Sequence, residues 1–125
     1  MTLSELRGII AALNLSDYTY MGNIDNKKDK SVGVYGRGSI SAFKKALGGE
    51  DSYDTKEVSL LVHWNKSPSE SEEAAYDLFN AVKNITNADI LFIKMINNEP
   101  VPIGTDKFGI YEYVIDFDVY YRLEE

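Results

Sequence analysis

The sequence predicts an α+β fold: one mixed, mainly antiparallel sheet with two main helices packed on it, in the order α-β-β-β-α-β-β-β. Two segments have apolar residues at the spacing of amphipathic helices. Several others alternate apolar and polar residues, as half-buried strands do. The longest alternating segment, residues 110–123, lies near the C-terminus and is expected to organise the sheet.

The composition fits a single domain over residues 1–125. The chain is 44% hydrophobic and 26% charged, and it has no cysteine, which excludes disulfides and thiolate chemistry. It shows no apolar segment of bilayer-spanning length and no signal peptide, so we expect no membrane association. The net charge of −7 argues against generic nucleic-acid binding, although an acidic surface lets DNA slide past without sticking.

The first predicted element is an amphipathic helix over residues 3–13. Thr2 and Glu5 have the spacing of a capping box, and Asn14 is suited to end the helix. Strands are predicted over 17–22 and 32–37. The polar loop between them suggests a hairpin with a long tip.

Residues 37–55 are the least regular part of the chain. Four glycines punctuate this segment, and residues 40–47 can form a short helix with Lys44 and Lys45 on its polar side. A loop this long in a small domain is usually functional or disordered. One alternative function is therefore a monomeric domain that binds a ligand through this loop.

A strand over residues 57–64 and a helix over 68–85 follow. Ser67 is a good N-cap, Pro68 suits the first helical position, and Glu70 completes the pattern of a capping box. Residues 89–96 are almost entirely apolar, which indicates a strand covered on both faces. The prolines after it predict a short edge strand.

The final predicted strand, residues 110–123, has one apolar and one mostly polar face. Its odd-numbered residues from Tyr111 to Leu123 are all apolar or aromatic, which predicts the core face. Fourteen residues span about 45 Å in a strand, whereas a domain of this size is about 35 Å across. We therefore expect the strand to bend, carry a bulge, or extend to a neighbouring subunit.

The polar face of this strand carries the strongest candidates for metal-binding residues. Asp116 and Asp118 point the same way, as metal-binding carboxylates do in phosphoryl-transfer enzymes, and Glu112 shares their face. A divalent-metal-dependent phosphoryl-transfer enzyme is therefore a second alternative. Tyr120 and Arg122 lie on the same face, so a solvated surface with cross-strand ion pairs is the favoured interpretation.

Two further candidates have weaker signals. His63 is the single histidine and can act as a general base beside a carboxylate, but a structural or surface role is favoured because no serine or cysteine arrangement accompanies it. The glycines flanking Arg37 lack the full spacing of a phosphate-binding loop. The residues expected to form an interaction surface are Arg37, Lys44, Lys45, Glu112, Asp116, Asp118, Tyr120 and Arg122.

The middle of the chain resembles a known family. Residues 58–82, VSLLVHWNKSPSESEEAAYDLFNAV, are similar to the strand, short loop and alanine-containing helix of bacteriophage minor capsid proteins of the tail-terminator type. The order of the flanking elements agrees, including the segment Pro-Val-Pro-Ile-Gly and the long closing strand.

This resemblance implies a non-enzymatic virion protein without catalytic residues, metals or cofactors. Such subunits form a homo-oligomeric ring, expected to be a hexamer, that ends growth of the tail tube and joins the tail to the head connector. The ring would be assembled in the bacterial host cytoplasm, and the acidic charge suits DNA passage without specific binding. We expect the even-numbered face of residues 110–123, or part of that strand, to lie at a subunit contact.

Overall fold

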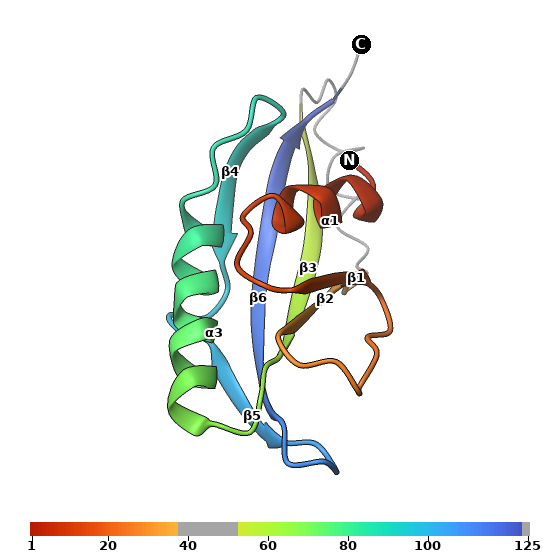
Figure 1. Cartoon of the computed structure of the whole chain (residues 1–125). Coiled ribbons are helices and arrows are strands. Elements are labelled where there is room, and N and C mark those ends of the chain that lie inside the picture. The colour runs from red at the N-terminus through yellow and green to blue at the C-terminus, as the bar shows by residue number, and fades with distance from the viewer. Residues whose placement is uncertain (38–52, 124–125) are drawn as a thin grey trace.

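The computed structural model describes residues 1–37 and 53–123. Two helices and a six-stranded mixed sheet form the fold, which confirms the predicted α+β class and element order (Figure 1). The helices are α1 (Leu3–Ala11) and α3 (Pro68–Lys83). The strands are β1 (Tyr18–Met21), β2 (Ser31–Gly36), β3 (Tyr53–His63), β4 (Ile90–Met95), β5 (Val101–Thr105) and β6 (Tyr111–Arg122). In the described residues, no helix is both long and apolar enough to cross a membrane.

Strand β6 is the centre of the sheet. One of its edges pairs antiparallel with β3 along its full length, from Tyr53 opposite Arg122 to His63 opposite Glu112. Its other edge pairs first with β4 and then with β5, which follow one another alongside it, each with a register shift. Nearly the whole length of β6 is therefore paired within its own sheet, because β3 has 11 residues and β6 has 12.

The first two strands are not a hairpin, so that prediction was wrong. Strands β1 and β2 are parallel, with Tyr18 opposite Ser31 and Met21 opposite Val34. Residues 22–30 therefore form a crossover that brings the chain back to the end of the sheet where β1 begins. The turn begins at Gly22, whose φ of +83° favours glycine. A polar loop between two strands has the same local pattern in either topology, so the sequence did not distinguish them.

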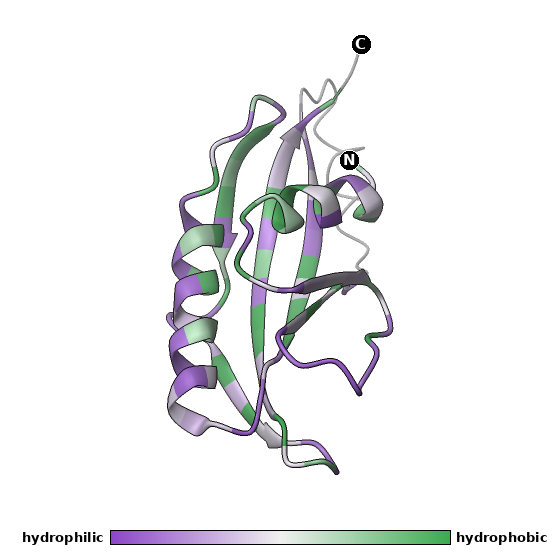
Figure 2. Ribbon diagram, viewed as in Figure 1, coloured by the Kyte–Doolittle hydropathy of each residue, from purple (hydrophilic) through white to green (hydrophobic). Residues whose placement is uncertain are grey.

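Both helices pack on one face of the sheet around a single core. Leu6 and Ile10 of α1 and four residues of α3 meet alternate residues of β2, β3 and β6. Figure 2 shows apolar and polar residues alternating along β3 and β6. The predicted core face of β6 is confirmed at the buried residues Tyr113, Ile115, Phe117 and Val119, but Leu123 beyond the end of the strand is 39% exposed.

The helix starts follow the capping residues in the sequence. Thr2 and Glu5 form a complete capping box at α1. At α3, the Ser67 side chain accepts a bond from the Glu70 amide, but the predicted reciprocal bond is absent from the described contacts. Asn65 takes its place: it receives the Ser67 amide and donates to the Glu70 carboxylate.

Strand β4 is not covered on both faces, contrary to the apolar pattern of its sequence. It pairs with β6 alone among the described strands, and the helices cover only one side of the sheet. Phe92 therefore points away from the core and is 54% exposed. Strand β5 is at an edge, as its prolines predicted.

Replacing Phe117 by alanine should lower the free energy of unfolding by about 3–5 kcal/mol, because it leaves a cavity at a side chain that is 0% exposed. Urea denaturation followed by fluorescence of the single tryptophan, Trp64, measures this change. The matched control is Phe108→Ala, at a side chain that is 49% exposed, which should change stability by no more than about 0.5 kcal/mol. Equal effects at the two positions would contradict the assigned core.

Stability should fall as the pH rises above about 10. Burial raises the pKa of Tyr113 and of Tyr121 above the ordinary value of 10.0, and the nearby Asp54 adds to the effect at Tyr121. The folded state then holds these protons more tightly than the unfolded state, so their contribution is complete below pH 10 and is lost through the raised pKa values. Thermal melts between about pH 9 and about pH 11 should show a smaller loss for Tyr113→Phe and Tyr121→Phe. An identical alkaline loss in both variants would count against this explanation.

Candidate functional site

The side of the sheet opposite the helices, which we call the open face, carries the even-numbered side chains of β6. Five of the residues predicted to form an interaction surface lie on this strand: Glu112, Asp116, Asp118, Tyr120 and Arg122. Their neighbours come from β2, β3 and β4, as the strand register requires. Three distinct environments follow one another along the face: a buried polar cluster, a pair of bonded aspartates and an aromatic row.

The two aspartates in the middle of the open face have protein partners. The Asp118 carboxylate forms an ion pair with Arg37, whose guanidinium also donates to the Phe117 carbonyl at 3.1 Å. The Asp116 carboxylate accepts a hydrogen bond from the Ser59 hydroxyl. The sequence predicted ion pairs on this face but did not identify the cation that pairs with Asp118. That cation is Arg37, whereas Arg122 donates to the Ala88 carbonyl.

Three aromatic side chains cross the open face from β3 to β4, and we call them the aromatic row: Tyr53, Tyr120 and Phe92. The Phe92 and Tyr120 rings stack with centroids 4.3 Å apart, and Tyr53 lies 6.0 Å from Tyr120 on the other side. Tyr53 and Phe92 are exposed. Exposed aromatic surface of this kind is typical of protein contacts, since aromatic residues are enriched there.

The crossover between β1 and β2 covers the other end of the open face. Ile24 of the crossover lies over Gly33, where an added Cβ would be 2.8 Å from its Cγ2 atom. Burial raises the pKa of the neighbouring Tyr35, which also forms a hydrogen bond to the Ile24 backbone. The crossover thus buries this half of the face and leaves the aromatic row uncovered by the described residues.

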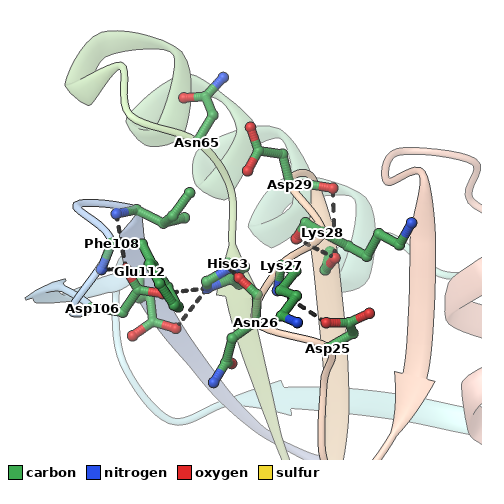
Figure 3. A network of polar contacts seen from close by, with 12 residues as sticks. Asp25, Asn26, Lys27, Lys28, Asp29, His63, Asn65, Asp106, Phe108 and Glu112 are labelled. Atoms are coloured by element: carbon green, nitrogen blue, oxygen red, sulfur yellow. Dashed lines mark hydrogen bonds and ion pairs between the residues drawn. The ribbon is translucent and has the colours of Figure 1, made fainter.

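Beneath the crossover lies a buried polar cluster around His63 (Figure 3). The ring is 0% exposed. Its Nδ1 atom lies 2.9 Å from Glu112 Oε2 and 3.8 Å from Asp106 Oδ2. Its Nε2 atom lies 3.1 Å from the Asn26 carbonyl oxygen. His63 is therefore a buried side chain and not a surface residue.

The sequence alone did not bring this cluster together. His63 and Glu112 lie on the polar sides of two long strands, a signal that was visible, but only the register places them opposite each other. Asp106 comes from the turn before β6, where its Oδ1 atom accepts the amides of Phe108 and Ile110. Turn geometry of this kind is not evident from residue spacing.

The remaining predicted site residues are not placed. Lys44 and Lys45 lie outside the described residues, as does most of the 37–55 loop of the ligand-binding alternative. A hollow of about 640 Å³ lies elsewhere, between α1 and the segment after α3, with Ile9, Leu13 and Ile85 in its lining.

The comparison with known proteins agrees with the resemblance seen in the sequence. Residues 7–122 match the family described as bacteriophage tail terminator protein. This match runs from within α1 to the end of β6 and covers well over half of the chain. No curated protein matches the chain. The extent of the family match shows that the chain belongs to the bacteriophage tail terminator family.

Proposed function

We propose that the protein is a non-enzymatic subunit of a hexameric ring that ends growth of the phage tail tube and joins the tail to the head connector. The observation that carries this proposal is the family match over residues 7–122. The ring would lie at the head–tail junction of the virion after assembly in the host cytoplasm. Its partners would be further copies of itself, the tail tube and the connector.

The open face is the surface that we assign to the contact between neighbouring subunits. Both edges of β6 are paired, so this strand offers a neighbour its face rather than its edge. The aromatic row provides exposed apolar area there. A second copy is the proposed occupant because β4 is apolar at every position except Lys94, as in a strand covered on both sides. The described residues of the single chain nevertheless leave the side with Phe92 uncovered.

The charge balance is consistent with a passage for DNA. A net charge of −7 repels phosphates, so DNA would slide through the ring without binding to specific residues. Within the ring, the paired aspartates would serve as a polar surface beside the aromatic row.

The geometry gives less support to the alternative of a metal-dependent phosphoryl-transfer enzyme. Asp116 already binds Ser59, and Asp118 already binds Arg37. A metal ion shared by the two aspartates would have to displace both partners. We therefore favour the structural role.

Light scattering of the purified chain should give a mass about six times the chain mass of 14.1 kDa, or should do so once tail tubes are added. The double variant Phe92→Ser and Tyr120→Ser should reduce this mass to that of the monomer, because it removes the stacked pair of the aromatic row. Circular dichroism checks that the variant remains folded.

The control for that experiment is Tyr76→Ser, which removes an exposed aromatic side chain from α3. This variant should assemble as the unchanged protein does. A chain that stays monomeric at high concentration and does not bind tail tubes would contradict the ring proposal. Assembly that is intact in the double variant would instead contradict only the assigned contact surface.

A further inference from the structure

We propose that His63, Asp106 and Glu112 form a binding site for a divalent transition-metal ion, for which Zn²⁺ and Mn²⁺ are suitable probes. One possible ligand atom from each side chain lies within 4.8 Å of the other two. The site is within one subunit and does not depend on the proposed ring.

The hydrogen bonds of His63 determine which ring nitrogen can bind a metal. Nε2 lies 3.1 Å from the Asn26 carbonyl oxygen, which can only accept, so Nε2 carries a proton. In the neutral ring Nδ1 then has a lone pair, and it faces the carboxylates of Glu112 and Asp106. Carboxylate oxygens and a nitrogen lone pair that converge on one point repel one another, and a proton or a cation between them removes that repulsion.

A proton on Nδ1 can supply that charge, but it leaves one oxygen without a partner. It would bond to Glu112 Oε2 at 2.9 Å, whereas Asp106 Oδ2 lies 3.8 Å away, beyond hydrogen-bonding distance. Asp106 Oδ2 is fully buried and has no hydrogen-bond partner among the described residues. A metal ion can bind all three side chains at once, so the unpartnered oxygen favours a metal over a proton.

The ligand atoms suit a transition metal better than Mg²⁺ or Ca²⁺. Imidazole nitrogen with carboxylate oxygen is a donor set used by Zn²⁺ and related ions, whereas Mg²⁺ and Ca²⁺ prefer oxygen alone. Two ligands at the tetrahedral angle, each about 2.1 Å from zinc, are about 3.4 Å apart. This separation lies between the 2.9 Å from Nδ1 to Glu112 and the 3.8 Å from Nδ1 to Asp106. The bond from Nε2 to a backbone carbonyl is the support that metal-binding histidines usually have.

The structure also holds the ligands in place. The Phe108 and Ile110 amides fix the Asp106 carboxylate through its other oxygen, at 2.9 and 3.0 Å. His63 and Glu112 are opposite each other in the β3–β6 ladder. A bound ion would therefore connect the end of β3, the start of β6 and the turn between β5 and β6, beneath the crossover.

The test is a titration of the untagged full chain, treated with chelator, with ZnCl₂ and separately with MnCl₂ at neutral pH. Calorimetry should show one saturable site for at least one of these ions, and thermal melting should shift upward because the ion binds the folded state. His63 is the single histidine and the chain has no cysteine, so the one histidine ring signal in NMR reports binding directly.

Asp106→Asn is the most informative variant because its remaining oxygen can still accept the Phe108 and Ile110 amides. It should weaken metal affinity by at least about tenfold, as should Glu112→Gln. The matched control is Asp116→Asn, on the same strand face but outside the cluster, which should keep the affinity of the unchanged chain.

The proposal is overturned if neither ion produces saturable heat or a shift in melting temperature, since the cluster would then hold only a proton. It is also overturned if Asp116→Asn weakens binding as much as Asp106→Asn, because the ion would then bind to general acidic surface. The titration of the unchanged chain is decisive even if a variant fails to fold.

Discussion

The antiparallel pairing of β3 with β6 is the constraint on which the rest of the fold depends. It runs from Tyr53 opposite Arg122 to His63 opposite Glu112, so one register sets both faces of the sheet. On one face it aligns the core side chains beneath the helices. On the other it aligns the buried cluster, the bonded aspartates and the aromatic row. A slip of one residue would exchange the two faces and bury the aspartates.

Local patterns in the sequence predicted the elements well. Alternation along β6 identified its core face, and the capping residues at Thr2 and Ser67 located the starts of both described helices. These signals act over a few residues, where side-chain period and hydrogen-bond chemistry leave few options. The direction of β1 against β2 was missed because it depends on how the crossover packs, which residues 22–30 do not reveal by composition.

The candidate site was predicted less completely, because it is built from pairings between distant segments. The even-numbered residues of β6 were identified, but their partners come from distant segments. Ser59 and His63 are placed by the register of β3 against β6, and Arg37 follows the end of β2. The apolar sequence of β4 gave a different kind of miss. It predicts cover on both sides, whereas the described residues of the single chain cover only one.

The central position of β6 has a consequence for how the chain folds. This strand follows every other described strand in the sequence, yet it supplies the pairing edge for β3, β4 and β5. Those strands must stay unpaired on that side until β6 has been synthesised, so the sheet forms late and through contacts between distant residues, which makes folding slow. During that interval the open edges of β3 and β4 are available for pairing with other chains. A cell that makes many copies of the protein at once therefore has to complete each sheet before neighbouring copies meet.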